Sequence, residues 1–215
     1  MNGTFITFEG PDGSGKTTQL RKLGEALINK GYSVLMTREP GGTLISDKLR
    51  TIILDPENKT MADTTEVLLY AASRAQHVYE TIIPALEAGR IVLCDRFVDA
   101  SVAYQSFGLG VDRQMVEGIN LFATTGLEPI RSYMIDVPVS ISLQRLEQRA
   151  SGLAALPLDR IERKSAAYHQ KVREGFHVIA ASSQERVVLV NGDRGEEDIF
   201  ADILADCLNL LRDRV

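Results

Sequence analysis

The chain has 215 residues, of which 44% are hydrophobic and 25% are charged, and its formal net charge is −5. This length and composition suit one domain with a sizeable core, and we expect a single domain over residues 1–215. The negative charge disfavours a general nucleic-acid binder, which needs a basic face. No run of 18 apolar residues and no basic-then-apolar N-terminal segment occurs. We therefore expect no nucleic-acid partner, no membrane partner and a cytoplasmic location.

Short apolar runs alternate with helical patterns, which predicts an α/β fold. The predicted strands span 4–9, 33–37, 90–94, 132–137 and 186–190. The predicted helices span 16–30, 43–54, 63–88, 97–106, 112–125, 138–149, 159–182 and 196–213. Several strands are almost continuously apolar, which favours a parallel sheet covered on both faces. Ligands on such sheets bind beyond the carboxyl ends of the strands, so the polar residues after each strand are the candidate site.

The first strand runs directly into a phosphate-binding motif. Residues 10–17 read GPDGSGKT and satisfy G-x-x-x-x-G-K-[ST], and a helical pattern follows. Glycines let backbone N–H groups surround an anion, and a helix N-terminus adds unpaired donors and partial positive charge. Lys16 can reach the β- and γ-phosphates of a nucleoside triphosphate, and the Thr17 hydroxyl can hold Mg²⁺. The residues assigned to nucleotide binding are Gly10, Pro11, Asp12, Gly13, Ser14, Gly15, Lys16, Thr17 and Thr18.

Arginines follow the second and third strands. Arg38 precedes the turn Pro40-Gly41-Gly42, and because Lys16 already serves the donor, Arg38 suggests a second anion carried by an acceptor. Asp95 ends the third strand at the position that holds Mg²⁺ in other phosphate-loop proteins, and Arg96 can fork onto a phosphate. On the 63–88 helix, Tyr70 and Arg74 share one face, which suits a planar base. That pair, taken alone, is equally compatible with a core tyrosine and a surface arginine.

The segment of about 145–162 has the features of a lid. Arg145 and Arg149 precede the small and apolar residues 150–158, and Asp159-Arg160-Ile161-Glu162 follow. A closing lid excludes water and brings positive charge to a transferring phosphoryl group. An ordinary loop between two helices would also fit this pattern. The three histidines show no metal-ligand spacing, and Cys94 and Cys207 fall in apolar segments as buried reduced thiols do.

Five segments in this order resemble bacterial thymidylate kinases: GPDGSGKTT, TREPGG, LLYAASRAQ, DRFVDASVAYQ and DRIE. The resemblance covers nearly the whole chain, and TREPGG together with the DRF…AYQ block is its specific part. It implies a three-layer P-loop kinase fold with a five-stranded parallel sheet flanked by helices, and a homodimer packed through helices. It also implies that ATP and dTMP, with Mg²⁺, give ADP and dTDP for dTTP synthesis.

The resemblance also implies roles for individual residues. Arg38 and Arg96 would hold the dTMP phosphate, and Asp12 would accept a hydrogen bond from the sugar 3′-OH. Tyr70 would stack on thymine and Arg74 would bond its O4, while Tyr104 would leave no room for a 2′-OH. Ser101 and Gln105 would help read the base and phosphate. Thr17 and Asp95 would hold Mg²⁺.

Some members of the family carry a catalytic arginine in the phosphate loop, where this chain has Gly13. The chain therefore resembles the type that supplies arginines from the lid. Arg149 and Arg160 are the best matches and Arg145 is a third candidate, because residues 150–158 contain no arginine. The expected catalytic set is Lys16, Asp95, Arg96, Arg149 and Arg160.

Two other readings remain open. The chain could be another P-loop nucleoside or deoxynucleoside monophosphate kinase, although TREPGG argues against this, and two arginines for an acceptor phosphate suit a monophosphate. It could instead be a P-loop switch ATPase that works through partners. A GTPase switch would carry an N-K-x-D motif after a late strand, and residues 191–194 read NGDR. An assay that offers ATP with each nucleoside monophosphate separates these readings.

Overall fold

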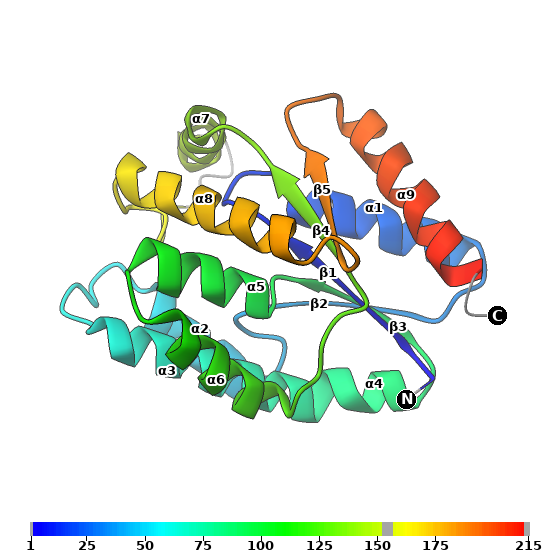
Figure 1. Cartoon of the computed structure of the whole chain (residues 1–215), viewed down its shortest axis with the longest axis horizontal. Coiled ribbons are helices and arrows are strands. Elements are labelled where there is room, and N and C mark those ends of the chain that lie inside the picture. The colour runs from blue at the N-terminus through cyan, green and yellow to red at the C-terminus, as the bar shows by residue number, and fades with distance from the viewer. Residues whose placement is uncertain (1, 152–156, 213–215) are drawn as a thin grey trace.

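The computed structural model describes residues 2–151 and 157–212. In this part of the chain a five-stranded sheet carries helices on both faces (Figure 1). The strands are β1 (Thr4–Glu9), β2 (Val34–Arg38), β3 (Ile91–Asp95), β4 (Arg131–Asp136) and β5 (Val187–Asn191). They lie in the order β2-β3-β1-β4-β5, and each neighbouring pair is parallel. The predicted α/β fold is confirmed, with each strand within one residue of its predicted bounds.

The helices alternate with the strands, as the parallel pairing requires. Those before β3 are α1 (Lys16–Asn29), α2 (Leu44–Leu54), α3 (Asp63–His77), η1 (Val78–Ile82) and α4 (Ile83–Glu87). Those after it are α5 (Val98–Ser101), η2 (Val102–Gly108), α6 (Arg113–Thr124), α7 (Val139–Ser151), α8 (Ala166–Ser182) and α9 (Glu196–Arg212). The segments η1 and η2 are π-helical turns.

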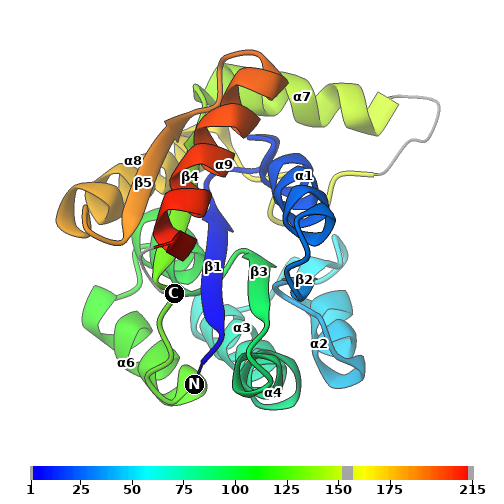
Figure 2. The same ribbon diagram turned by 90° about the vertical axis from the view of Figure 1, so that its right-hand side faces the viewer.

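Alternation along the strands divides the core between two faces. Ile6 and Phe8 of β1 point to one face, where they pack with residues of α1 and α9. Phe5 of β1 and Met134 of β4 point to the other face, which is covered by η1, α4, η2 and α8. Figure 2 shows α1 and α9 on one side of the strands and α3, α4 and α6 on the other. These are the three layers that the sequence predicts.

The predicted helix over 63–88 is divided into three pieces. α3 ends at His77, a π-turn covers Val78–Ile82, and α4 follows. Pro84 explains the break, because it lacks an N–H and its ring clashes with the carbonyl four residues earlier. Widening the turn over Val78–Ile82 relieves that clash. The predicted helix over 97–106 is likewise divided into α5 and η2.

The predicted start of the helix over 159–182 is wrong. Residues 160–163 form turns, and α8 begins only at Ala166. Ser165 is its N-cap and accepts a hydrogen bond from the Tyr168 N–H. Asp159 starts the preceding turn, because its carboxylate accepts bonds from the N–H groups of Ile161 and Glu162. The central part of the predicted lid, residues 152–156, lies outside the described residues.

Strand register brings the predicted polar segments together at one edge. Phe8 of β1 lies opposite Asp95 of β3, and Arg38 of β2 also lies opposite Asp95. The loop that follows β1 therefore emerges beside Asp95 and Arg96, with Arg38 one strand further out. This edge is the carboxyl end of the parallel sheet, where the polar residues were expected to gather.

Candidate active site

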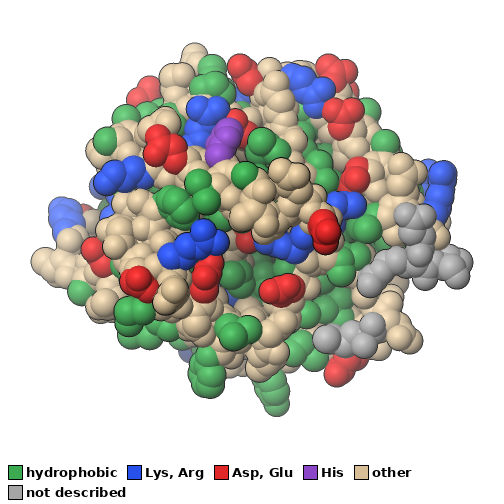
Figure 3. Space-filling view, viewed as in Figure 1, with side chains coloured by type: hydrophobic (Ala, Val, Ile, Leu, Met, Phe, Trp, Pro, Cys, Tyr) green, Lys and Arg blue, Asp and Glu red, His purple; other side chains and the backbone are tan. Residues whose placement is uncertain are grey.

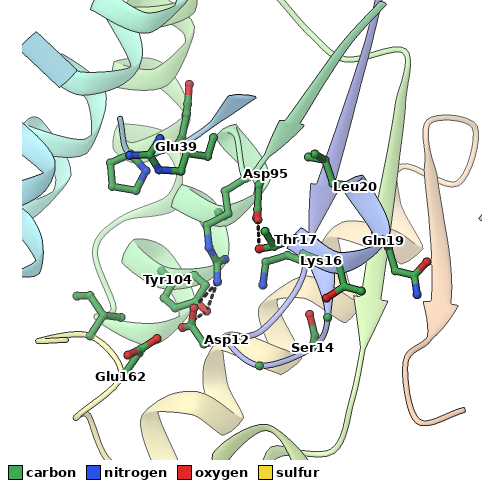
Figure 4. A pocket seen from close by; sticks show the side chains of 18 of the residues that line it. Asp12, Ser14, Lys16, Thr17, Gln19, Leu20, Glu39, Asp95, Tyr104 and Glu162 are labelled. Carbon is green, nitrogen blue, oxygen red and sulfur yellow. Dashed lines mark hydrogen bonds and ion pairs between the residues drawn. The ribbon is translucent and has the colours of Figure 1, made fainter. Parts of the chain in front are cut away.

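A cavity of about 870 Å³ lies at the carboxyl edge of the sheet. It is formed by the loop after β1, the ends of β2 and β3, one face of α3 and the start of η2 (Figure 4). Charged side chains from several of these elements point into the same space. The residues lining it include the whole predicted site set except Gly10, Pro11 and Arg160. The lining members of the set are Asp12, Gly13, Ser14, Gly15, Lys16, Thr17, Thr18, Arg38, Tyr70, Arg74, Asp95, Arg96, Ser101, Tyr104, Gln105 and Arg149.

Glycines give the phosphate loop its shape. Gly10 has φ 128°, and a Cβ there would lie 2.2 Å from the carbonyl oxygen of Ile135. Gly15 has φ 99° and turns the chain into α1, so that the free N–H groups at the start of that helix face the loop. The buried Ser14 hydroxyl has no hydrogen-bond partner among the described residues. A loop of this shape can enclose a phosphate.

Lys16 points back into the loop. Its ammonium donates to the carbonyl oxygen of Pro11 over 2.6 Å, and the residue is buried. Burial, together with the positive charge of Arg96, lowers the pKa of Lys16 to about 8. A bound polyphosphate would supply the negative charge that this ammonium lacks.

Thr17 and Asp95 meet at the start of α1. The Thr17 hydroxyl donates to a carboxylate oxygen of Asp95 over 2.5 Å, as Figure 4 shows. Hydroxyl and carboxylate oxygens are the hard ligands that Mg²⁺ prefers, and both lie beside the phosphate loop. The pair is therefore chemically suited to Mg²⁺.

Arg96 joins the phosphate loop to η2. Its guanidinium donates to Asp12 over 2.6 Å and to the Tyr104 hydroxyl over 3.1 Å, and Tyr104 donates in turn to Asp12 over 2.7 Å. Burial opposes ionisation of Asp12, but Arg96 and Lys16 outweigh it and hold the pKa of Asp12 at about 2. The backbone of Arg96 has φ 72°, a strained conformation for a residue with a side chain. Such strain is typical of functional sites.

Two more arginines lie near β2. Arg38 pairs with Asp47 over 3.0 Å and half of its side chain is exposed. Arg50, on α2, lines the cavity and donates to the Pro40 carbonyl oxygen over 2.9 Å. Arg50 could not be assigned from the sequence, because nothing in the helical pattern of α2 shows which face meets the turn after β2.

Most N–H groups of the Arg74 guanidinium are hydrogen-bonded to other residues of the protein. Its buried guanidinium donates to Glu39 over 2.7 Å, to the Phe97 carbonyl oxygen over 2.9 Å, to Ser101 over 2.9 Å and to Asn120. A guanidinium has five N–H groups, so these four bonds leave one N–H without a partner among the described residues, and Arg74 lines the cavity. The sequence suggests a base-reading arginine here, but it does not show the four partners of Arg74, which come from segments remote in the chain.

Glu39 also holds His77, whose Nδ1 lies 3.0 Å from the Glu39 carboxylate while its Nε2 contacts Thr37. Glu39, His77 and Cys94 place ligand atoms within 4.8 Å of one another. Glu39 already carries Arg74, and burial, with the nearby Glu39 charge, keeps the pKa of the Cys94 thiol well above its usual range. The group is therefore a buried hydrogen-bonded cluster, and the spacing of the histidines in the sequence did not indicate that His77 lies beside Cys94 and a carboxylate. Both cysteines are free and buried.

The three candidate lid arginines lie in different places. Arg149, at the end of α7, lines the cavity and pairs with Glu162 over 2.7 Å. Arg145 also lines it and donates to the carbonyl oxygens of Gly13 and Gly192. Arg160 does not line it, because its guanidinium is turned to Glu66 at 2.7 Å and to the Ile53 carbonyl oxygen at 2.8 Å. Arg149 and Arg145 therefore line the cavity, whereas Arg160 lies outside it.

Other lining residues were not assigned from the sequence. Gln19 follows the phosphate loop on α1, and its buried Oε1 has no partner among the described residues. Gly192 and Arg194 lie in the polar segment after β5. The sequence places this segment at the carboxyl end of a strand but gives its residues no specific role. Asp159 and Glu162 face the cavity from the turn before α8. Burial raises the pKa of Asp159 to about 6, and the Glu162 carboxylate acts in the same direction.

A phosphate loop after the central strand, beside a second group of arginines around the same cavity, defines a P-loop kinase with separate places for donor and acceptor.

Comparison with known proteins gives the family. The thymidylate kinase family model matches residues 8–203. A thymidylate kinase from Exiguobacterium sibiricum is 50% identical over 214 residues, which cover 100% of this chain and 98% of that protein. One from Geobacillus is 43% identical over the full length of both. The crystal structure of thymidylate kinase from Ehrlichia chaffeensis superposes with a TM-score of 0.76 at 29% identity, covering 95% of this chain and 98% of that one.

The chain belongs to the thymidylate kinase family, as its sequence motifs indicated. In the described part of the chain, no helix is both long and apolar enough to cross a membrane.

Proposed function

We propose that the protein transfers the γ-phosphoryl group of ATP to dTMP in this cavity. Some of the residues described above bind the donor, ATP, and others bind the acceptor, dTMP. Family membership makes the chain a thymidylate kinase, an enzyme that forms dTDP and ADP from dTMP and ATP. The observation that carries the division of roles is one cavity with two sets of cationic groups. Lys16 lies on the phosphate loop, and Arg38 and Arg96 lie at the ends of the neighbouring strands.

On the donor side, the loop amides and Lys16 hold the β- and γ-phosphates. The buried Ser14 hydroxyl has no hydrogen-bond partner in the described part of the chain and is available to an anion, which supports this role. Thr17 and Asp95 would hold Mg²⁺, and the ion would supply positive charge against the negative charge that develops during phosphoryl transfer.

On the acceptor side, Arg38 and Arg96 hold the dTMP phosphate. Arg96 is bonded to Asp12 and Tyr104, and Arg38 to Asp47, so a phosphate held by the two arginines would take the place of some of these partners. Asp12 stays ionised because its pKa is about 2, and it accepts from the sugar 3′-OH. The buried Tyr104 ring lies beside Asp12 and closes the space that a 2′-OH would need.

The thymine base lies between α3 and η2. Tyr70 lines this part of the cavity and stacks on the ring, and the one free N–H of Arg74 donates to O4. Ser101 acts through Arg74, since its hydroxyl accepts from that guanidinium. Gln105 lines the same wall and reads the edge of the base next to O4.

The chemistry needs positioning more than acid or base catalysis. An oxygen of the dTMP phosphate attacks the γ-phosphorus of ATP, the bond from that phosphorus to the β–γ bridging oxygen breaks, and ADP leaves. The nucleophile is already an anion, so no side chain must remove a proton. Arg38 and Arg96 cancel repulsion between the two substrates, and Arg149 reaches the transferring group from α7, leaving Glu162. The lid that we propose over about 145–162 excludes water during transfer.

The homodimer that we propose uses the apolar face of α3, η1 and α6. The large apolar residues exposed on these elements are Leu68, Tyr79, Met115, Leu121 and Phe122. Hydrophobic side chains protrude from the lower edge of Figure 3, where Figure 1 places α6 and α4. A surface that exposes this much apolar area is typical of a subunit interface.

The proposed function is tested by release of ADP from ATP with dTMP, dUMP, dCMP, dGMP or no acceptor. We expect rapid release with dTMP and slow release without an acceptor. Comparable release with dGMP would favour a different monophosphate kinase. Slow hydrolysis that no acceptor changes would favour a switch ATPase.

A further inference from the structure

Arg160, Glu66 and Gln105 form a chain of contacts from the turn before α8 to the base pocket. Arg160 belongs to the turn Asp159–Glu162, which we name the DRIE turn. Its guanidinium lies 2.7 Å from one carboxylate oxygen of Glu66 on α3. The other carboxylate oxygen accepts a hydrogen bond from the Gln105 amide nitrogen over 3.0 Å. Only Gln105 of the three lines the cavity.

Glu66 is set in place from both sides. It is 1% exposed, so its charge needs a partner, and Arg160 supplies one through an ion pair rather than an aligned hydrogen bond. Arg160 is fixed in turn, because its Nε donates to the Ile53 carbonyl oxygen and its backbone N–H donates to that of Leu54. The C-terminal end of α2 therefore anchors the DRIE turn, and the turn anchors Glu66.

An ionised carboxylate accepts hydrogen bonds and cannot donate one. The Gln105 amide can therefore meet Glu66 only through its NH₂ group. Its carbonyl oxygen then lies at the other end of the amide and makes no hydrogen bond within the described residues. Because Gln105 lines the cavity, that free oxygen is available to a ligand. The orientation of the amide follows from the charge of Glu66.

This orientation matters for the choice of base. Thymine presents a hydrogen-bond acceptor at O4 and a donor at N3, whereas cytosine presents a donor at position 4 and an acceptor at N3. The site offers the free N–H of Arg74 and the free oxygen of Gln105, a pattern that matches thymine and opposes cytosine at both atoms. Reversal of the Gln105 amide would place two donors where thymine also has one.

We propose that Glu66, held by Arg160, is a positioning residue that fixes the Gln105 amide with its oxygen toward the substrate and thereby selects thymine over cytosine. This inference rests on the proposed function, since it assumes that dTMP binds with its base at Gln105. It gives Arg160 a place in base selection in place of the transition-state contact expected from the sequence.

The test measures the Kd of dTMP and of dCMP by calorimetry, with kcat and KM for dTMP, in four proteins: wild type, Glu66→Gln, Gln105→Leu and the double variant. Glu66→Gln can donate to Gln105 and so permits the reversed amide. We expect its dTMP Kd and KM to rise about 10-fold, kcat to stay within about twofold, and the preference for dTMP over dCMP to fall about 10-fold. In the Gln105→Leu background, Glu66→Gln should add no further loss of preference.

If Glu66→Gln lowers the melting temperature but leaves the dTMP-to-dCMP preference unchanged, Glu66 has only a structural role. If the losses of preference in Glu66→Gln and Gln105→Leu add up in the double variant, Glu66 does not act through Gln105. If Glu66→Gln does not fold, Arg160→Lys replaces it. That variant keeps the charge beside Glu66 and should lose no more than about threefold in preference, whereas Arg160→Met should lose about 10-fold. Equal preferences in both Arg160 variants and wild type would overturn the proposal. A wild-type protein that does not turn over dTMP would instead refute the proposed function.

Discussion

Seven arginines and Lys16 line one cavity in a chain whose formal net charge is −5. Several of these cations are paired with carboxylates, among them Arg74 with Glu39 and Arg96 with Asp12. These pairs compensate charges that would be costly to bury alone. At the scale of single residues, the site is therefore a set of ion pairs, which we propose that the substrate phosphates rearrange.

Lys16 is the residue on which the donor site most depends. Lys16→Ala removes the buried ammonium that faces the phosphates, and we expect kcat to fall at least about 1000-fold with little change in melting temperature. Release of ADP in the presence of dTMP measures this. Lys30→Ala, at the exposed end of α1, is the control and should match wild type. Turnover within tenfold of wild type in Lys16→Ala would exclude the role given to Lys16.

The ionisation of Asp159 should make the free energy of unfolding depend on pH. Burial, with the Glu162 carboxylate, raises its pKa from 3.8 to about 6, so the folded state favours the protonated form and loses stability as pH rises from about 4 through 6. Asp159→Asn keeps an oxygen for the two N–H bonds but carries no charge. It should raise the free energy of unfolding by about 1 kcal/mol at pH 7.5 and by nothing at pH 4.

Urea unfolding at the two pH values measures this difference. Asp193→Asn, at an exposed carboxylate, should change stability at neither pH. A gain for Asp159→Asn that is the same at pH 4 and pH 7.5 would mean that the charge of Asp159 is not its source.

Residues that follow strands could be predicted from the sequence, whereas residues held by distant partners could not. The phosphate loop, Arg38 and Asp95-Arg96 follow strands, and local pattern alone places them at the carboxyl edge. Arg50 joins the cavity through the packing of α2, which no local pattern fixes. Arg160 was expected at the site from its place in the lid. Its guanidinium instead pairs with the buried carboxylate of Glu66, 94 positions earlier in the chain.

At the scale of elements, strands were easier to predict than helix ends. Apolar runs fixed each strand within one residue, but helical periodicity does not reveal a π-turn or a cap. The DRIE turn was predicted as helix because Asp159 was not recognised as the residue whose carboxylate bonds the following N–H groups. That turn matters, since it carries Glu162, the partner of Arg149.

The pairing of Arg149 with Glu162 leads to a kinetic prediction. Arg149→Ala removes a charge that acts on the transferring phosphoryl group, so we expect kcat to fall about 100-fold or more and the KM for dTMP to rise less than about threefold. Initial rates over a range of dTMP concentrations measure both. Arg163→Ala, an exposed arginine just after the DRIE turn, is the matched control. A large rise in KM at constant kcat would make Arg149 a binding residue.

At the scale of the whole molecule, the apolar face of α3, η1 and α6 predicts the oligomeric state. Phe122 is 87% exposed, and Phe122→Glu would place a charge in a subunit interface. We expect this variant to sediment as a monomer where wild type sediments as a dimer. Ile28→Glu alters an exposed apolar residue on α1, in the opposite layer, and should remain dimeric. Identical sedimentation of Phe122→Glu and wild type would place the interface elsewhere.

The most direct measurement follows the γ-phosphorus itself. ATP labelled at that atom is incubated with the protein in the presence and absence of dTMP, and the products are separated. We predict that the label appears in dTDP in equal amount to the ADP formed, with little inorganic phosphate in either sample. Label released as inorganic phosphate at the same rate with and without dTMP would contradict the account of this cavity as a place where one phosphate loop serves two substrates.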